Sequence, residues 1–374
     1  MVEGTKKLSR TVADLSDQIN IDREMPQVLV NQMSDQGFFR LLVPKSVGGL
    51  EISHPDFLEI VFEIAKADGS VAWCLNQNNV LGTLAAFMPQ SLANSIWTDT
   101  NSVLSNGPPK STNLSVTKGG YRLSGRWDFS SGIRHANWVI AVAKMGEKPS
   151  LSESGVLRHM VVPKDSVKLI DSWEVSGLRG TGSFSFEIED AFIPENYCFV
   201  ETKSPIEEGP LYHIPRSLLF SSGFATVALG VARSGLNSVK ELSRSKEPQE
   251  QAMLMEQVTT QRDIGMAEAI WKSCFAYLKE STEAMWESVS EERAIPLERR
   301  IDLRLASTHA IREAVRVIQI AYGLCGSSAI FQQTRIQRCF QDVNAISQQI
   351  QGRMSHYETA GQHFLGNEPD SRFH

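Results

Sequence analysis

The sequence has little of what marks a secreted, metal-binding or nucleic-acid-binding protein. Its 374 residues include only five cysteines, and none forms a CxxC pair, so neither a disulfide framework nor a metal site is indicated. A formal net charge of −6 leaves no basic surplus for nucleic acid or an anionic membrane. No uncharged apolar run approaches the ~20 residues of a membrane span, and the N-terminus is polar where a signal peptide is apolar. These absences predict a cytoplasmic protein with no metal, no nucleic acid and no membrane as partner.

The pattern of apolar and polar residues changes twice along the chain. Residues 8–100 read as mostly helical, and the alternation of apolar and polar residues typical of strands begins near residue 103. Helical spacing returns at about residue 205 and continues to the end. A chain of this length exceeds one hydrophobic core. The pattern therefore predicts an α+β protein of three domains, over residues 1–102, 103–204 and 205–374.

Short signals mark the helices on both sides of this β region. His54-Pro55-Asp56 places proline near the first position of a helix, and Asp68-Gly69-Ser70 ends that helix and begins another. In the C-terminal third, small residues around 221–232 allow close helix packing. Three further helices are predicted over residues 250–289, 296–323 and 329–351. Four antiparallel helices of this length predict a four-helix bundle.

One of the predicted N-terminal helices changes from apolar to amide-rich within a few residues. Residues 71–79 carry Trp73, Asn76 and Asn79, and the amides form either a satisfied polar helix face or one wall of a substrate cavity. In the second case Phe224 and Gln349, from the C-terminal third, are expected to line the same cavity. The identity of a substrate does not follow from these residues.

Three motifs, in a fixed order along the chain, carry a resemblance to a known family. They are Phe129-Ser130-Ser131-Gly132 with the nearby Ala136-Asn137-Trp138, the glycine- and arginine-containing segment 173–183, and the C-terminal pair Gly323…Gly326 with Arg335…Arg338…Asp342. Together they are similar to motifs of the acyl-CoA dehydrogenase fold. The resemblance implies an N-terminal α domain, a central β-barrel domain, a C-terminal four-helix bundle and a homotetramer built as a dimer of dimers.

The resemblance also implies where a flavin lies. Ser131 falls on the threonine that contacts the flavin in the family, so we expect it to act as the catalytic hydroxyl near the flavin N5 and O4. The other cofactor-binding residues implied are Trp127, Phe129, Ser105, Asn106, Arg179, Gly323, Gly326, Arg335 and Arg338. Competing roles remain open at this point: a hydroxyl that satisfies a turn for Ser131, core packing for the tryptophans, and support of its own turn for Arg179.

The residues that a dehydrogenase of this fold uses as its base are absent at the matching positions. Counted without gaps from Asp342, the usual glutamate position holds Gln349-Ile350, and a second location falls near Phe220. Glu358 lies about two helical turns too late and is expected to cap a helix or contact a subunit more than to serve as a base. The histidine of many hydroxylases on this fold is also missing, and His135 is the histidine nearest in sequence to Ser131.

The turn Ser105-Asn106-Gly107-Pro108-Pro109, read with residues 125–132, looks like that of two-component flavin monooxygenases. These include 4-hydroxyphenylacetate, seco-steroid and dibenzothiophene monooxygenases. Such enzymes take reduced FAD or FMN from a separate NAD(P)H-flavin reductase, bind O₂, form a C4a-hydroperoxyflavin and oxygenate an aromatic or heteroaromatic small molecule. The alternatives are an FAD-dependent dehydrogenase or oxidase of the acyl-CoA dehydrogenase type, and a relative that has lost its chemistry.

Overall fold

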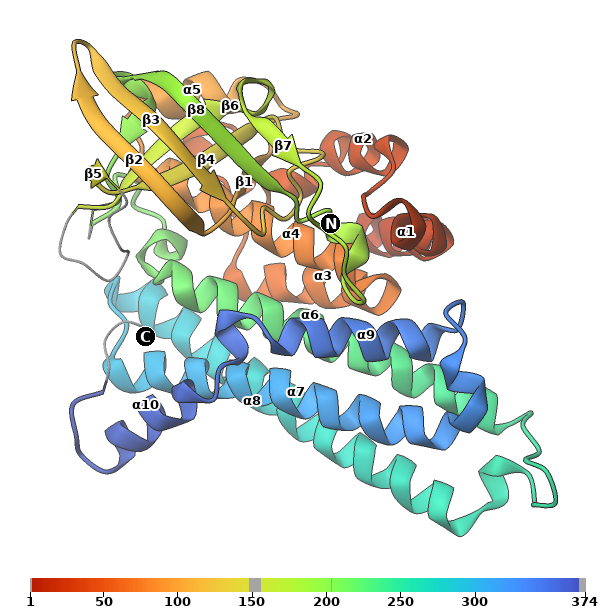
Figure 1. Ribbon diagram of the computed structural model, residues 1–374. Coiled ribbons are helices and arrows are strands. Elements are labelled where there is room, and N and C mark those ends of the chain that lie inside the picture. Colours follow the sequence, from red (N-terminus) through yellow and green to blue (C-terminus); the bar gives the residue numbers. More distant parts are fainter. Residues whose placement is uncertain (1, 148–155, 203, 370–374) are drawn as a thin grey trace.

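A computed structural model describes residues 2–147, 156–202 and 204–369. The sheets lie on one side of the molecule, the long C-terminal helices lie on the other, and α3 and α4 run between them (Figure 1). The N-terminal helices are α1 (Val2–Asp22), α2 (Gln27–Asp35), α3 (His54–Ala67), α4 (Gly69–Gly82) and α5 (Gln90–Trp97). The mixture of helices and sheets is that of an α+β protein.

The two helix starts predicted in the N-terminal third are confirmed by their capping contacts. The Ser53 hydroxyl accepts a hydrogen bond from the Asp56 backbone N–H, with proline in the first turn of α3. The Asp68 carboxylate accepts from the backbone N–H groups of Ser70 and Val71, which begins α4 in a new direction. The cap at Asp68 aims α4 along the β domain, which positions the amide-rich segment.

The strands form two sheets that pack face to face. In the described part of the chain one sheet has four strands in the order β1-β4-β6-β9, and the other has five in the order β5-β2-β3-β8-β7. Their bounds are β1 (Leu104–Asn106), β2 (Pro109–Thr117), β3 (Gly120–Trp127), β4 (Trp138–Ala143), β5 (Gly146–Glu147), β6 (Arg158–Pro163), β7 (Lys168–Ile170), β8 (Ser185–Pro194) and β9 (Cys198–Phe199).

The four-stranded sheet is buried on both faces. Val139 and Ala141 of β4 face the other sheet, whereas Ile140 and Val142 pack on the helical side with residues of α4 and α5. Successive strand residues point to opposite faces, so a strand covered on both faces is apolar at every position. This explains the uninterrupted apolar run 139–143 and fixes the sheet, with its loops, against α4.

The C-terminal helices are close to the predicted ranges but differ at the end of the chain. They are α6 (Arg216–Ser243), α7 (Val258–Glu292), α8 (Leu297–Cys325), α9 (Arg335–Ser347) and α10 (Ser355–Phe364). The helix predicted over 329–351 is shorter, because residues 326–330 form a 3-10 turn and a second 3-10 turn begins at Ile350. The sequence pattern did not indicate α10 as a separate helix.

Helix α6 crosses the centre of the molecule. Its length and composition would suffice for a membrane span, but 83% of its most apolar window is buried inside the protein. It packs against α3, α4, α8 and α9, and Gly230 lets its backbone approach α3, where a Cβ would meet the Ala65 methyl at 2.4 Å. These contacts are those of the core helix of a folded domain.

Trp127, predicted as an aromatic wall of the flavin site, is instead a core residue of the β domain. Its side chain is fully buried between the sheets, stacks on Phe186 with ring centroids 5.0 Å apart, and donates its indole N–H to the Val142 carbonyl oxygen at 3.0 Å. A side chain enclosed in this way has no surface left for a cofactor. The competing role stated for it, core packing, is the one that the structure shows.

We therefore expect Trp127→Phe to weaken the fold without weakening flavin binding. The loss of one buried hydrogen bond and part of a ring lowers the free energy of unfolding by about 1–3 kcal/mol. Chemical denaturation and a flavin titration measure the two quantities on the same preparation. A variant of unchanged stability but weaker flavin affinity contradicts the core role.

Candidate active site

The loop after β3 brings an aromatic ring to the surface. Phe129 has a positive φ of 56°, an uncommon conformation for a bulky residue. The turn is held by two backbone bonds, Ser130 N–H to the Phe184 carbonyl and Gly132 N–H to the Thr181 carbonyl. Phe129 is 63% exposed, and its ring contacts Trp173 edge to face. The loop thus offers a fixed, exposed aromatic ring, and the contact of Phe129 with a cofactor stays a prediction.

Two residues further on, the Ser131 hydroxyl lies at the meeting point of α4 and the β domain. Trp73 of α4 donates its indole N–H to Ser131 Oγ at 3.0 Å, and Ser183 Oγ lies 2.7 Å from the same atom. Ser131 is 5% exposed. The structure therefore joins the predicted catalytic hydroxyl directly to Trp73, a predicted substrate residue.

Of the two residues predicted from the turn at 105–109, Ser105 has a supporting position. It is fully buried, and its hydroxyl bonds Ser130 Oγ and donates to the Ser131 carbonyl oxygen, both at 2.9 Å. The prediction that Ser105 touches the cofactor is corrected accordingly: it holds Ser131 in place. Asn106 accepts from Gln77 Nε2 at 2.8 Å, and Gln77 is a site neighbour that the sequence reasoning passed over although it stands in the amide-rich segment.

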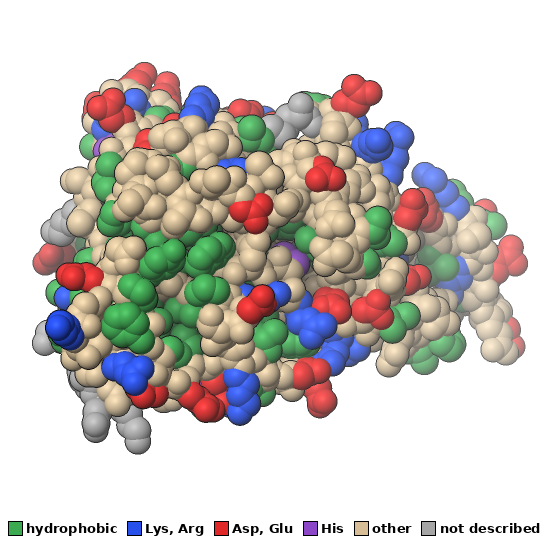
Figure 2. Space-filling model, turned by 90° about the horizontal axis from the view of Figure 1, so that it is seen from above, with side chains coloured by type: hydrophobic (Ala, Val, Ile, Leu, Met, Phe, Trp, Pro, Cys, Tyr) green, Lys and Arg blue, Asp and Glu red, His purple; other side chains and the backbone are tan. Residues whose placement is uncertain are grey.

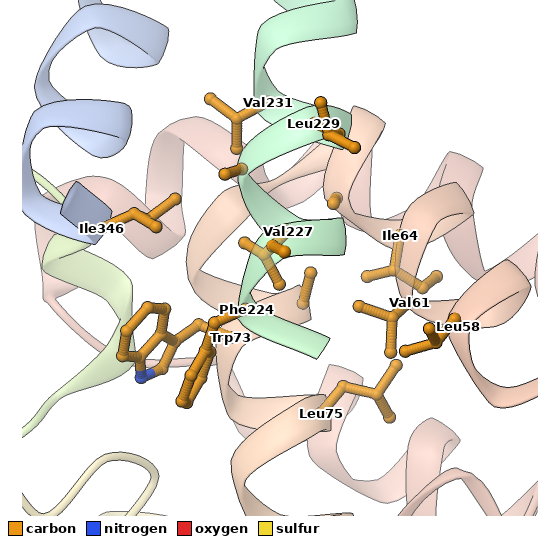
Figure 3. Packing of buried hydrophobic residues seen from close by; sticks show 14 of the residues in the cluster. Leu58, Val61, Ile64, Trp73, Leu75, Phe224, Val227, Leu229, Val231 and Ile346 are labelled. Atoms are coloured by element: carbon orange, nitrogen blue, oxygen red, sulfur yellow. The ribbon is translucent and has the colours of Figure 1, made fainter. Parts of the chain in front are cut away.

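Trp73 and Phe224 form one buried aromatic pair. Their ring centroids are 3.8 Å apart, with 22° between the planes. Figure 3 shows Trp73 on α4 and Phe224 on α6 lying face to face, with Ile346 of α9 beside them. The fold brings Trp73 of α4 and Phe224 of α6 into contact, next to α9. That they bind a substrate stays a prediction.

Asn76 is the buried polar group of this region that has no partner. Its side chain is fully buried, and neither amide atom makes a hydrogen bond within the described chain. The amide lies against Gly223 of α6, where an added Cβ would stand 1.9 Å from Asn76 Oδ1. An unpaired buried amide costs free energy that folding alone does not explain. This is the sign expected of a group kept for a ligand.

Asn79, also predicted to contact substrate, has a structural task. Its Oδ1 accepts from the backbone N–H of Leu41 at 2.8 Å and of Leu42 at 3.4 Å, while Nδ2 donates to the carbonyls of Phe38 and Leu75. Fully buried and fully bonded, it ties α4 to residues 38–42. The prediction of a substrate contact is wrong for Asn79, because no polar atom of its amide is left to bind one.

Two further residues carry unpaired buried atoms. His54, at the start of α3, bonds Ser222 Oγ through Nε2 at 2.9 Å, and its Nδ1 has no partner in the described chain. Burial lowers the pKa of His54 to about 3, so it is neutral at physiological pH. The sequence pattern indicates His54 only as the start of a helix. Gln349, a predicted substrate residue, accepts from Gln351 N–H, and its Nε2 is buried and unpaired.

His135 is held by the protein and remains uncharged. Its ring stacks on Phe39, and Nε2 lies 3.1 Å from Asn78 Oδ1, which acts as the acceptor. Burial, and then the charge of Lys164, lower the pKa of His135 to about 3. A neutral histidine fixed in this way supports the loop and is a poor proton donor. Glu358 lies exposed in the first turn of α10, where a carboxylate favours the helix dipole.

The predicted phosphate-binding arginines contact groups of their own chain. Arg335 donates to Ser234 Oγ, Ser16 Oγ and the Lys66 carbonyl oxygen. Arg338 bonds Ser16 Oγ and forms an ion pair with Asp17 of α1. Their role toward a flavin phosphate stays a prediction, and these contacts show that they also fasten α9 to α1.

Neither Arg179 nor the C-terminal glycines form a hydrogen bond with Ser131 in the described chain. Arg179 donates to the carbonyl oxygens of Asn20 and Val175, so it supports its own turn, as the competing role had it. Gly323 is near the end of α8, and Gly326 follows it with a φ of +50° beside Lys246. Figure 1 places this turn at the end of the helical layer beyond the sheets.

Asp342 is buried beside this cluster and titrates unusually high. Its Oδ1 accepts from the Leu178 backbone N–H at 2.6 Å, and no ion pair to Arg335 or Arg338 is found in the described chain. Burial, and then the nearby charge of Asp68, raise the pKa of Asp342 to about 7. Asp342 is thus bonded to the backbone of the β domain.

This raised pKa predicts a pH dependence of stability. The folded protein binds the Asp342 proton more tightly than the unfolded chain, so the stability it contributes is present at low pH and lost as pH rises from about 4 through 7. Asp342→Asn keeps an acceptor for Leu178 and has no charge to bury. Between pH 5 and pH 8 we expect the variant to gain about 2 kcal/mol relative to wild type.

Urea denaturation of both proteins at the two pH values measures this difference. Taking the difference cancels the opposite effect of His54 and His135, whose lowered pKa values remove stability as pH falls below their ordinary range. A difference that stays constant between pH 5 and pH 8 shows that the Asp342 carboxyl keeps an ordinary pKa.

Comparison with known proteins gives matches over most of the chain. The family model described as the acyl-CoA dehydrogenase N-terminal domain matches residues 5–91, and that of the C-terminal domain matches residues 222–352. The chain is 30% identical over 352 residues to indole-3-acetate monooxygenase of Pseudomonas putida, covering 93% of this chain and 89% of that protein.

A second relative is 24% identical over 393 residues: the oxygenase component of the FADH₂-dependent resorcinol hydroxylase of a Rhizobium species, with 100% of this chain and 95% of that protein covered. Among solved structures, XiaF from a Streptomyces species, in complex with FADH₂ and glycerol, superposes with a TM-score of 0.91 at 21% identity over 100% of this chain and 96% of that one.

Proposed function

The chain belongs to the flavin-dependent monooxygenases of the acyl-CoA dehydrogenase family, and we propose that it uses reduced flavin and O₂ to oxygenate an aromatic or heteroaromatic small molecule. The observation that carries this proposal is the buried aromatic pair of Trp73 and Phe224, tied by the Trp73 indole N–H to Ser131. A flat apolar substrate packs well against the edges of such a pair, next to the Ser131 hydroxyl.

The residues present fit a flavin ring. Phe129 offers an uncovered aromatic face, Ser131 Oγ a neutral hydrogen-bonding atom, and Asn106 a half-buried amide. A neutral, largely apolar lining suits a planar ring system whose oxygen chemistry must be kept from water. The flavin supplies the electrons and the activation of O₂. The protein's own groups bind, orient and shield.

The dehydrogenase alternative requires a carboxylate base at the substrate. Gln349 holds the matching position, and the nearest candidate in sequence, Glu358, is exposed on α10. The relatives named above are monooxygenases and hydroxylases. Oxygenation of an electron-rich ring needs no strong base. The lack of a carboxylate at the matching position and the names of the relatives both support this function.

The reductant and the partner protein follow from the same proposal. One relative is named as the oxygenase component of an FADH₂-dependent hydroxylase. In support of the same arrangement here, we propose that FADH₂ or FMNH₂ is delivered to this chain by a separate NAD(P)H-flavin reductase. We propose Ser131, Phe129 and Asn106 for the ring. For the phosphate end we propose Arg335, Arg338 and the backbone at Gly323 and Gly326, where glycine permits close approach.

We further propose a cytoplasmic homotetramer, with domains over 1–102, 103–204 and 205–374, the two sheets closing as a barrel and α6–α9 as a four-helix bundle. Ile330 and Phe331, beside Gly326, are 61% and 53% exposed. Figure 2 shows an apolar area on the face seen from above, with charged side chains around it. Exposed apolar surface of this kind is covered in an assembly, and light scattering gives the mass directly.

The deciding experiment combines the protein with a flavin reductase, NADH and labelled dioxygen. Indole-3-acetate and a set of phenols and indoles serve as substrates, each with FAD and with FMN. We expect one labelled oxygen atom per product molecule with at least one aromatic compound. Reduction of a bound flavin by an acyl-CoA, without NADH and without oxygen incorporation, assigns the dehydrogenase function instead.

A further inference from the structure

Four side chains form an unbroken line of hydrogen bonds through the candidate site. The Trp73 indole Nε1 donates to Ser131 Oγ at 3.0 Å, and Ser131 Oγ lies 2.7 Å from Ser183 Oγ. Ser183 Oγ lies 2.7 Å from Thr181 Oγ1, which donates to the Leu178 carbonyl oxygen at 2.9 Å. All four side chains are buried, so water does not compete for these bonds.

The direction of every bond in this line is fixed by its two ends. An indole nitrogen only donates, and a carbonyl oxygen only accepts. Thr181 donates its one hydroxyl proton to the Leu178 carbonyl oxygen. The hydrogen bond between Ser183 and Thr181 is therefore donated by Ser183. Ser183 then has no proton left for Ser131, so Ser131 must donate to Ser183.

Ser131 is thereby left with a lone pair and no proton for any further partner. It accepts from Trp73 and donates to Ser183, and its second lone pair is the only hydrogen-bonding capacity that remains. A partner at this hydroxyl must therefore be a donor. A partner atom that can only accept forms no hydrogen bond with Ser131 Oγ, because two lone pairs then face each other and repel.

We propose that Ser183 and Thr181 are positioning residues that make this site select reduced flavin over oxidised flavin. N5 of reduced flavin carries a proton and is a donor, whereas N5 of oxidised flavin is an acceptor only. Ser131, held as an acceptor by the line behind it, pairs with the first and not with the second. The inference rests on the proposed function, because it requires a flavin N5 at Ser131.

The test is a pair of anaerobic titrations, with oxidised and with dithionite-reduced flavin, on variants behind Ser131. In Ser183→Ala the Ser131 hydroxyl loses its acceptor, so its proton can be donated to the flavin. In Thr181→Val, Ser183 can donate to Ser131 instead of to Thr181, and the Ser131 proton is again free for the flavin. Both variants are expected to bind oxidised flavin about three- to tenfold more tightly, the effect of one gained hydrogen bond. Their affinity for reduced flavin should change less than twofold.

Three control variants test the donor–acceptor direction of these hydrogen bonds. Thr181→Ser keeps the hydroxyl and should restore the wild-type ratio of the two affinities. Trp73→Phe removes the bond on the other side, leaves the Ser131 proton on Ser183, and should give no gain for oxidised flavin. Ser172→Ala removes a similar serine pair, with Ser185, elsewhere in the β domain, and should leave the ratio unchanged.

Tighter binding of oxidised flavin distinguishes this role from simple structural support, because a damaged fold would bind both oxidised and reduced flavin more weakly. If Ser183→Ala and Thr181→Val weaken both forms equally, or leave their ratio unchanged, the inference is wrong while the oxygenase function stands. If the wild-type protein binds neither form, the proposed function fails and the inference fails with it. Either result is read from equilibrium binding, independently of turnover.

Discussion

Replacing Ser131 by alanine is expected to weaken the binding of reduced flavin by about ten- to hundredfold. The substitution removes the lone pair that we propose for the flavin N5–H, which is then buried without an acceptor. The Trp73 indole N–H also loses its acceptor, which lowers stability in the free and the bound protein alike. Each unpaired buried donor costs about 1–3 kcal/mol, and 1.4 kcal/mol is tenfold in affinity. Product formed per NADH consumed should fall as well, with the missing oxygen released as hydrogen peroxide.

Anaerobic titration and a peroxide assay measure the two effects. Ser131→Thr, which keeps the hydroxyl, is the matched control and should retain most of the affinity. The competing role for Ser131, a hydroxyl that serves only its turn, predicts that Ser131→Ala loses stability and keeps both its flavin affinity and its coupling. That outcome removes Ser131 from the site.

The second large effect is expected at Asn76, where function and stability should change in opposite directions. Asn76→Leu, nearly equal in shape, replaces two unpaired buried polar atoms by apolar ones. We expect the free energy of unfolding to rise by about 1–3 kcal/mol. The rate of oxygenation, kcat/KM, should fall at least about tenfold, because a substrate loses its hydrogen-bonding partner.

Asn79 provides the control one helical turn away. Asn79→Leu makes the same substitution on the same helix, but there four hydrogen bonds to backbone groups are lost. We expect the stability of this variant to fall by several kcal/mol, roughly 1 kcal/mol or more for each bond broken. Urea denaturation of the two variants gives the signs. Equal destabilisation by both contradicts the idea that Asn76 is held unpaired for a ligand.

Much of the fold follows from local patterns in the sequence. The caps at Ser53 and Asp68 are local contacts between residues close in the chain, which is why they could be predicted. The end of the chain was predicted less well. The break after residue 323 was predicted, but a 3-10 turn over residues 326–330 delays the start of α9, and a second one over residues 350–352 separates α9 from α10.

The site was predictable as a set of segments but not side chain by side chain. Strand alternation places Trp127 and Phe129 on the same face, yet one is fully buried and the other largely exposed. The positive φ at Phe129 breaks the alternation, and no sequence pattern announces it. Likewise Asn76 and Asn79 are alike in sequence, and only the groups packed around each amide separate a paired from an unpaired one.

The same limit applies to partners that are distant in sequence. Thr181 and Ser183 stand in a glycine-rich turn whose residues read as backbone support, and their alignment behind Ser131 arises from the packing of loops from both sheets. His54 stands at a helix start and meets Ser222 only because α3 and α6 pack together. Contacts of this kind depend on the tertiary fold.

The hydrogen bonds between α9 and α1 also affect the order in which parts of the chain can fold. Ser16 and Arg338 are 322 residues apart, and Asp342 reaches Leu178 across 164 residues. Loops this long close slowly, because their entropy must be lost before the contact is gained. On the ribosome, α1 and the turn at Leu178 emerge long before α9. The contacts between α1 and α9 therefore form late, whereas the packing of α1 on α3 needs only the N-terminal part of the chain. A chain ending before α9 should be more open to proteolysis in α1.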